Sequence, residues 1–210
     1  MNRILLADDH SFVRLGLIQI LKDEYPFAKI KEVSDGDSLV KEVLHYDWDF
    51  VISDLDMPGK SGLEALQQIK LIKPGLPVLI LSYFTEDVYG IRVLKAGASG
   101  FMNKNAVPYE LITAIKRILS GKKYITPEIA EKLLRIPDDG DKLHELLSNR
   151  EFEIFKLLSN GKTISHIAEL LSIAPTTVST HRGSIMEKLG LSTNSELTRY
   201  AITHRLIADM

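Results

Sequence analysis

The sequence has no cysteine in its 210 residues, and no charge of one sign dominates it. The absence of cysteine excludes a disulfide scaffold and thiol chemistry. Lys and Arg number 26 against 28 Asp and Glu, so the formal net charge is −2. Because this balance leaves no basic tail, bulk charge does not argue for nucleic acid as a partner.

Long hydrophobic runs are also missing. The first ten residues, MNRILLADDH, hold only four apolar residues in a row before two acids, which is not the pattern of a signal peptide. No stretch approaches the roughly 18 apolar residues of a membrane span. With 45% hydrophobic residues the chain has enough apolar surface for a real core. We therefore expect a cytoplasmic protein that has no membrane partner.

Short apolar runs alternate with helical patterns over the first 121 residues. Most of the runs are continuously apolar, which is typical of strands covered on both faces in a parallel sheet. Helical spacing is clearest at 107–119, and Ser61 with Glu64 forms a capping box that opens another helix. This alternation predicts an α/β domain with a doubly wound, five-stranded parallel sheet. The expected strands are ILLA (4–7), AKIKEV (28–33), DFVIS (49–53), PVLILS (77–82) and SGFMN (99–103).

The pattern changes after residue 121. Residues 122–144 contain a possible short helix at 127–135 and the polar, turn-rich segment IPDDGDK, so we expect a linker there. Residues 145–210 show no strand pattern and predict a small all-α domain of four helices. The first begins at a capping box formed by Ser148 and Glu151, and the others are expected near 163–171, 175–189 and 193–206.

Polar side chains follow four of the expected strands. Asp8 and Asp9 follow the first strand, Asp54 the third, Ser82 ends the fourth and Lys104 follows the fifth. In open parallel sheets ligands bind outside the carboxyl ends of the strands, so these groups are expected to converge. Clustered carboxylates repel one another unless a cation intervenes, and Mg²⁺ suits an open site with few carboxylates.

This constellation is suited to phosphoryl transfer. The Asp54 carboxylate can accept a phosphoryl group as an acyl phosphate, with Lys104 neutralising its charge and Ser82 donating a hydrogen bond. The backbone carbonyl of Asp56 is placed to reach the metal ion. Taken singly, each of these residues has an ordinary alternative as a turn former, a helix cap or a solvated charge. Their joint placement at strand ends favours the functional interpretation.

These residues resemble the receiver domain of two-component response regulators, a flavodoxin-like fold. The matching marks are the acid pair, the segment DLDMPGKSG, Ser82 and the segment GFMNK. The resemblance implies that Asp54 is the phosphoacceptor, that Asp8 and Asp9 bind Mg²⁺, and that Ser82 and Phe101 form the switch. Phe101 is equally explained as a core residue. The family often has Lys-Pro where this chain has Lys104-Asn105, so a cis bond is not expected here.

Residues 163–189 fit a helix-turn-helix. Their apolar positions share one face, and small polar groups are left to face outward near a helix N-terminus, where they suit a DNA groove. The alternative is an ordinary polar helix face, and the charge of Arg182 and Lys188 against Glu187 supports DNA only weakly. The residues expected to face outward are Thr176, Thr177, Ser179, Thr180, Arg182, Gly183 and Ser184, and we include Lys188 among the DNA-binding residues.

Residues 147–191 resemble the LuxR-type DNA-binding domain. Ser179 stands where that family usually has a lysine, and the helix cap is Ala174, a weaker cap than the usual serine. Both differences predict a lower affinity for DNA or an altered preference among DNA sites. With the receiver, this resemblance implies the NarL/FixJ class of response regulator, with a receiver domain at 1–121, a linker at 122–144 and a DNA-binding domain at 145–210.

The implied function is a phosphorylation-switched transcription regulator, not an enzyme beyond its own Mg²⁺-dependent phosphorylation and dephosphorylation. Its implied partners are a sensor histidine kinase, double-stranded DNA and, when active, a second copy of the chain. Two alternatives are a receiver that acts as a phosphorylation-independent dimerisation module and a haloacid-dehalogenase-like phosphatase. The second rests on the motif DLDMP, but that family places its motif after the first strand and has Thr or Val where this chain has Pro58.

Overall fold

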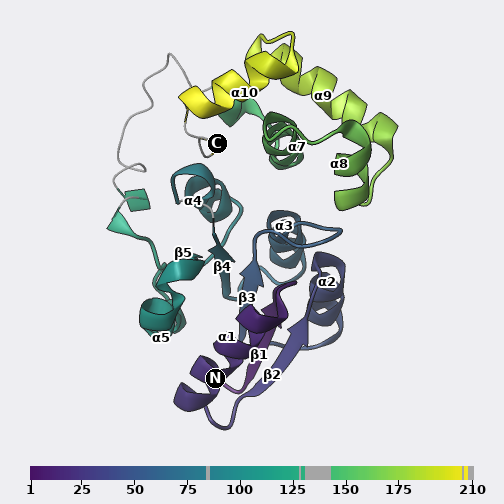
Figure 1. Ribbon diagram of the computed structural model, residues 1–210. Helices are drawn as coiled ribbons and strands as arrows, with labels where there is room; N and C mark the ends of the chain where they lie inside the picture. Colours follow the sequence, from purple (N-terminus) through teal and green to yellow (C-terminus); the bar gives the residue numbers. More distant parts are fainter. Residues whose placement is uncertain (84–85, 128, 131–142, 205, 208–210) are drawn as a thin grey trace. The chain divides into compact units, whose positions relative to one another are not determined.

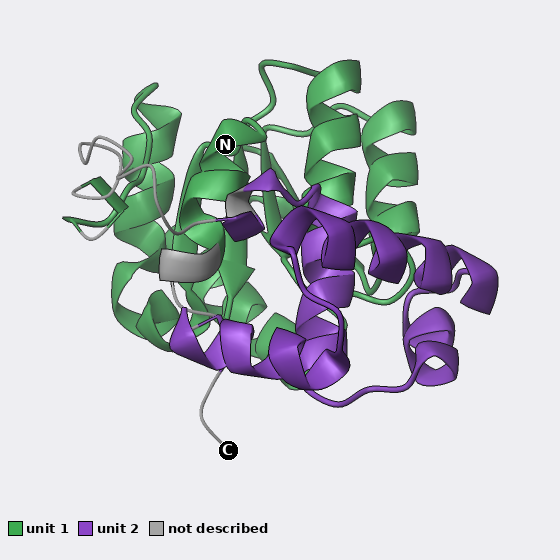
Figure 2. Ribbon diagram, turned by 90° about the horizontal axis from the view of Figure 1, so that it is seen from above, with its two compact units in different colours: residues 1–135 green, residues 136–210 purple. Residues whose placement is uncertain are grey.

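The computed structural model describes residues 1–83, 86–127, 129–130, 143–204 and 206–207. The chain divides into two compact units, residues 1–135 and 136–210, shown in different colours in Figure 2. The short helix expected at 127–135 lies mostly outside the described residues. Of that span the structure describes 127, 129 and 130, which are helical.

Within the described part of unit 1, five strands form one sheet in the order β2-β1-β3-β4-β5. Every pair of neighbouring strands is parallel. The order reverses between β1 and β3, so the flavodoxin-like, doubly wound sheet expected from the alternating pattern is confirmed. The strands are β1 (Arg3–Ala7), β2 (Lys29–Val33), β3 (Phe50–Asp54), β4 (Val78–Ser82) and β5 (Gly100–Asn103).

The central strands are buried along their whole length, as their continuous apolar sequences predict. Every residue of β3 and β4 is buried. The edge strand β2 differs, because Lys29, Lys31 and Glu32 are exposed along it. Its run AKIKEV is not continuously apolar, so this exposure agrees with its sequence. Charged side chains on an edge strand discourage pairing with another chain.

Helices cover both faces of the sheet (Figure 1). The helices α1 (Ser11–Glu24) and α5 (Val107–Leu119) pack on one face, where Leu17, Leu111 and Ile115 join a buried cluster with β1, β3, β4 and β5. The opposite face carries α2 (Gly36–His45), α3 (Gly62–Ile72) and α4 (Glu86–Lys95).

Unit 2 is helical throughout its described elements. A 3-10 turn at Leu143–Leu146 precedes α7 (Asn149–Ser159), α8 (Ile164–Leu170), α9 (Pro175–Leu189) and α10 (Asn194–Thr203), so the four predicted helices are confirmed. The predicted last helix ran to 206, whereas α10 ends at Thr203. In the described parts of the chain, none of the helices is long and apolar enough to cross a membrane.

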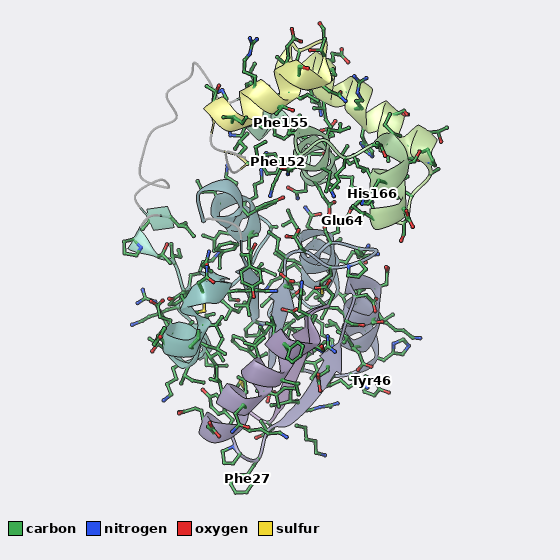
Figure 3. The ribbon with its side chains drawn as sticks, in the orientation of Figure 1. Phe27, Tyr46, Glu64, Phe152, Phe155 and His166 are labelled. Carbon is green, nitrogen blue, oxygen red and sulfur yellow. The ribbon has the colours of Figure 1, made fainter. Side chains whose placement is uncertain are left out.

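Local sequence signals explain where these helices begin and end. The capping boxes of Ser61 with Glu64, Ser148 with Glu151, and Thr193 with Glu196 are all formed. Pro175 occupies the first turn of α9, and Gly190 ends that helix in a left-handed conformation with φ 64°. The side chains of Phe152 and Phe155 (Figure 3) are fully buried in the small core that these helices share.

Candidate functional site

The carboxyl ends of four strands meet at one edge of the sheet, on both sides of the switch point. Asp8 follows β1, Asp54 ends β3, Ser82 ends β4 and Lys104 follows β5. All four residues are buried, with exposed fractions of 1%, 3%, 0% and 6%. Buried charged residues need partners because desolvating a charge is costly.

Lys104 joins two of these carboxylates. Its Nζ lies 2.7 Å from Asp54 Oδ2 and 2.7 Å from Asp8 Oδ2. Burial alone would lower the pKa of Lys104, but the hydrogen bonds and charges of the two acids outweigh it, so the pKa is raised. Burial raises the pKa of Asp54 to about 6, against the opposing effect of Lys104. The site thus holds one cation between two buried acids.

The acid pair and Asp54 form a cluster that a metal ion fits. Ligand atoms of Asp8, Asp9, His10 and Asp54 lie within 4.8 Å of one another. Asp8 Oδ2 also contacts the Lys104 ammonium at 2.7 Å, so this oxygen is already paired with one cation. Carboxylate oxygens are the ligands that Mg²⁺ prefers, so the donor atoms of this cluster suit the ion.

The loop after β3 contacts both the side chain and the backbone of Asp54. The backbone N–H of Asp56 donates to Asp54 Oδ1 at 3.3 Å, while the Asp56 residue itself is exposed. Gly62 packs against this backbone so closely that a Cβ there would lie 2.0 Å from the carbonyl oxygen of Asp54. The Ser61–Glu64 capping box fixes the start of α3 at the same point (Glu64 is labelled in Figure 3).

The two expected switch residues are fully buried. Ser82 pairs with Asn103 in the register of β4 and β5, and Phe101 pairs with Ile80. The burial of Phe101 fits both a core residue and a switch aromatic. Among the described residues there is no cis peptide bond, in line with the expectation for Lys104-Asn105. A 3-10 turn begins at Lys104, with Asn103 Oδ1 accepting from the backbone N–H of Asn105 at 2.9 Å.

Three further residues contact this site and were not identified from the sequence. Arg14 Nη1 donates to the backbone carbonyl of Asp8 at 2.6 Å. His10 Nδ1 lies 2.7 Å from Asp9 Oδ1. The ring of Tyr83 lies over the Lys104 ammonium, with 5.0 Å between Nζ and the ring centroid. Their nearness in sequence to Asp8, Asp9 and Ser82 was the only available signal.

In unit 2, most residues expected to face outward from α9 do so. Thr176, Thr177, Ser179, Thr180 and Gly183 are exposed. The hydroxyls of Ser179 and Thr180 donate to backbone carbonyls one turn earlier. Arg182 is partly buried, and its Nε donates to Asn194 Oδ1 at 2.9 Å. In the described structure the Ala174 side chain caps nothing, as expected for alanine.

Two residues of α9 turn instead toward a buried acid of α7. The Ser184 hydroxyl donates to Glu151 Oε1 at 2.5 Å, so the expectation that it faces outward is wrong. Lys188 Nζ lies 2.8 Å and 2.6 Å from the two carboxylate oxygens of Glu151, although 38% of the Lys188 side chain stays exposed. Its charge is therefore already paired within the unit.

Comparison with known proteins identifies both units. Residues 4–116 match the family model described as the response regulator receiver domain, and residues 145–201 match bacterial regulatory proteins of the luxR family. Response regulator UvrY of Escherichia coli strain K12 is 34% identical over 209 residues, covering 98% of this chain and 96% of the relative. Response regulator GacA of Pseudomonas aeruginosa strain PAO1 is 32% identical over 210 residues, covering 99% and 98%.

The chain is also similar to solved structures of response regulators. A structure of the Salmonella typhimurium response regulator RcsB has a TM-score of 0.71 at 26% identity, covering 97% of this chain and 99% of that one. RcsB of Salmonella enterica serovar Typhimurium, bound to the promoter rprA with the phosphomimetic BeF₃⁻, has a TM-score of 0.67 at 25% identity, covering 97% and 100%.

The parallel sheet with acids and a lysine at its carboxyl edge defines a response-regulator receiver. With its luxR-type unit, the chain belongs to the NarL/FixJ class of two-component response regulators. Its function is phosphorylation-dependent regulation of transcription rather than the turnover of a substrate by a typical enzyme.

Proposed function

We propose that Asp54 is the residue that accepts the phosphoryl group. The observation that carries this assignment is the Lys104 ammonium, which lies 2.7 Å from the carboxylates of both Asp54 and Asp8. A cation held beside a buried carboxylate is placed to neutralise charge on a phosphoryl group attached there. A carboxylate that only caps a turn does not need a buried lysine beside it.

The transfer itself needs few groups. A carboxylate oxygen of Asp54 attacks the phosphorus of the donor, here the phosphohistidine of a sensor kinase. The new oxygen–phosphorus bond forms as the bond from phosphorus to the donor nitrogen breaks, and that electron pair leaves with the histidine. Lys104 then lies beside the phosphoryl oxygens, and the Ser82 hydroxyl donates to one of them.

Mg²⁺ is the proposed cofactor. The carboxylates of Asp8, Asp9 and Asp54 and the backbone carbonyl of Asp56 would hold it, and the close grouping of the three carboxylates supports this assignment. When bound, the ion supplies positive charge opposite the phosphoryl oxygens. Self-catalysed phosphorylation and dephosphorylation would therefore both require it.

The response to phosphorylation passes from Ser82 to Phe101. In this proposal Ser82 moves toward the phosphoryl oxygens and Phe101 shifts into the space it leaves, which biases a two-state equilibrium toward a dimer. We propose a receiver domain at 1–121, a linker at 122–144 and a DNA-binding domain at 145–210. In support, the two family matches end at 116 and begin at 145.

Unit 2 would bind double-stranded DNA through α9. The exposed polar residues Thr176, Thr177, Ser179, Thr180 and Gly183 are proposed to meet the groove, and Arg182 to meet a phosphate. Lys188 contributes less directly, because its ammonium is paired with Glu151. In support, related structures include an RcsB–DNA complex and two RcsB dimers on two parallel DNAs.

Intact mass and size measured before and after a small phosphodonor test the receiver assignment. Acetyl phosphate or phosphoramidate with Mg²⁺ should add one phosphoryl group and shift the protein toward a dimer. Asp54→Asn should add none, whereas Asp56→Asn, which keeps its backbone carbonyl, should still be labelled. Labelling of Asp54→Asn at the normal rate would overturn the assignment. Labelling without any change in size would instead support a dimerisation module that ignores phosphorylation.

A further inference from the structure

The loop between β3 and α3 is held at two separate places. At its base, Gly62 packs against the backbone of Asp54, and the Gly62 N–H donates to the carbonyl oxygen of Leu55 at 2.8 Å. In its second half the loop contacts the start of α2, a helix that packs beside α3 (Figure 1). Asp56, whose backbone carbonyl is a proposed Mg²⁺ ligand, lies between these two places along the chain.

The second contact joins Lys60 of the loop to Asp37, in the first turn of α2. Lys60 Nζ donates to Asp37 Oδ1 at 2.8 Å, and the two residues are 23 apart in the sequence. The hydrogen bond from the Lys60 ammonium is the main cause that lowers the pKa of the Asp37 carboxyl, and the Lys60 backbone N–H contributes as well. One carboxylate of α2 therefore holds both the side chain and the backbone of Lys60.

Two glycines allow this close approach. A Cβ on Gly36 would lie 2.0 Å from the carbonyl oxygen of Lys60, so the first residue of α2 touches the loop backbone directly. Gly59 has φ 71°, a left-handed conformation that glycine adopts without strain, and a Cβ on it would lie 2.9 Å from Asp37 Oδ2. The ion pair thus adds to a backbone contact that already brings the loop against α2.

We propose that Asp37 is a positioning residue that, through Lys60, holds the β3–α3 loop in the conformation that binds Mg²⁺. This inference rests on the proposed function, in which the Asp56 carbonyl is one of the ligands of the ion. Asp37 acts from α2 and does not belong to the acid cluster found among the described residues at the strand ends.

The physical basis is that a ligand in a loop is only as well placed as the loop itself. If the loop moved among several conformations, Mg²⁺ would bind only the fraction in which the Asp56 carbonyl faces the cluster. The apparent affinity would then be reduced by that fraction. A contact that raises the fraction strengthens binding without adding a ligand. An ion pair at the surface shifts such an equilibrium by about two- to fivefold.

Isothermal titration calorimetry of the full-length protein with MgCl₂ measures the dissociation constant of the ion without relying on phosphorylation. Asp37→Ala removes the carboxylate, Asp37→Asn keeps an oxygen for the Lys60 N–H, and Lys60→Met keeps the aliphatic stem without the charge. Asp47→Ala is the matched control, because Asp47 forms an ion pair with Lys73 at 2.6 Å near the opposite, amino end of β3. Thermal unfolding without Mg²⁺ checks that each variant is folded.

We expect Asp37→Ala to raise the dissociation constant about two- to fivefold, with smaller rises in Asp37→Asn and Lys60→Met and none in Asp47→Ala. The double variant Asp37→Ala/Lys60→Met should bind like Asp37→Ala alone, since both substitutions remove the same contact. Labelling of Asp37→Ala by acetyl phosphate should need more Mg²⁺ for its half-maximal rate but reach the wild-type rate at saturating Mg²⁺. A purely structural defect does not produce that separation.

An unchanged dissociation constant in Asp37→Ala would overturn the positioning role, as would an equal rise in Asp47→Ala or additive effects in the double variant. Should Asp37→Ala not fold, Lys60→Met decides in the same way. If the wild type binds no Mg²⁺, or Asp8→Asn binds it equally well, the metal assignment fails and the positioning role fails with it. If Asp8→Asn weakens binding but Asp37→Ala does not, only the role of Asp37 is wrong.

Discussion

Lys188 forms an ion pair with Glu151, 37 residues earlier, with 2.6 Å between Lys188 Nζ and Glu151 Oε2. The same carboxylate accepts from the backbone N–H of Ser148 and from the Ser184 hydroxyl. Glu151 thus completes the capping box that starts α7 and also holds the second half of α9. Glu151 therefore adds polar contacts to the apolar packing that holds the helix proposed to enter the DNA groove.

Glu151→Gln should lower the stability of unit 2, and the loss should depend on pH. Burial alone would raise the pKa of Glu151, but the hydrogen bonds from Lys188, Ser184 and Ser148 lower it to about 2, from 4.5. The folded pKa is depressed, so the stabilisation is present above pH 4.5 and is lost as pH falls toward 2. At pH 7 we expect the variant to lose about 2 kcal/mol.

Urea unfolding followed by far-UV circular dichroism measures this loss. The fluorescence of Trp48, the single tryptophan, identifies the transition of unit 1 separately. Glu196→Gln is the matched control, because Glu196 completes a capping box in the same way, and its pKa is lowered chiefly by the backbone N–H groups of Ser192 and Thr193, with a smaller contribution from Arg199. A loss in Glu151→Gln no larger than in Glu196→Gln, or one that persists unchanged at pH 3, would contradict the prediction.

Gly62→Ala should destabilise unit 1 and displace Asp54. An added Cβ would lie 2.0 Å from the carbonyl oxygen of Asp54, so the loop between β3 and α3 must move. We expect a cost of about 3 kcal/mol, in the upper range for overpacking. Gly16→Ala is the control: its Cβ meets nothing within 4 Å in the middle of α1, and replacing a helical glycine with alanine should stabilise by about 0.5–1 kcal/mol. The urea midpoint of unit 1, followed by Trp48 fluorescence, measures the stability of both variants. Equal midpoints for Gly62→Ala and Gly16→Ala would contradict the prediction.

Much of the receiver site could be predicted from the sequence because it depends on topology. Parallel strands place their carboxyl ends at one edge, so residues such as Asp8, Asp54 and Lys104 meet whatever the detailed packing of the helices. Helix starts were predictable for a similar reason, since a capping box is local. Neither the strand-end site nor the helix starts depend on how elements distant in the sequence pack against one another.

The features that could not be predicted depend on how elements that are distant in the sequence pack against one another. Ser184 was expected outside because the 3.6-residue period says which residues share a face of α9, but not how much of that face α7 covers. The contact of Tyr83 with Lys104 likewise joins two loops whose paths are set by tertiary packing.

Mg²⁺ should stabilise unit 1 by binding the acid cluster. An ion that binds only the folded state adds about 1.4 kcal/mol at a concentration tenfold above its dissociation constant. Thermal unfolding of unit 1 should show a rise in stability with increasing MgCl₂, and EDTA should remove that rise. Asp8→Asn should abolish the rise, because it replaces a carboxylate of the cluster, whereas Asp23→Asn at the far end of α1 should keep it. A rise of equal size in Asp8→Asn would mean that the ion binds elsewhere.

Ser82→Ala should uncouple phosphorylation from its response. The fully buried hydroxyl lies at the end of β4, beside the proposed phosphoryl position, so its loss leaves the Asp54 nucleophile intact. We expect the variant to take up one phosphoryl group but to dimerise and bind DNA less than the wild type does. Intact mass, sizing and a DNA shift assay report these steps separately, with Ser120→Ala at the end of α5 as the control. Wild-type dimerisation of phosphorylated Ser82→Ala would remove Ser82 from the switch.

Arg182→Ala should weaken DNA binding to all sequences and flatten its salt dependence. The Arg182 side chain is partly exposed, and its Nε donates to Asn194 Oδ1 at 2.9 Å. If it neutralises one phosphate, its loss should reduce the slope of log affinity against log salt by about one unit. The unit has few positive charges, and Lys188 is already paired with Glu151, so the wild-type slope should itself be shallow. Arg199→Ala on α10, exposed but off this face, should leave the slope unchanged.

Ser179→Lys provides the opposite test at the same surface. Ser179 is exposed on the outward face of α9, at a position where the resemblance to the LuxR-type domain implies a lysine. The added cation should therefore raise the affinity for DNA and steepen the salt dependence by about one unit. Binding of the phosphorylated full-length protein to a DNA pool, measured between low and moderate salt, gives both slopes. A dimer that presents α9 twice should also select two half-sites about one helical turn apart. If Arg182→Ala and Ser179→Lys both leave affinity and slope at wild-type values, α9 does not face DNA, and another surface of unit 2 must be sought.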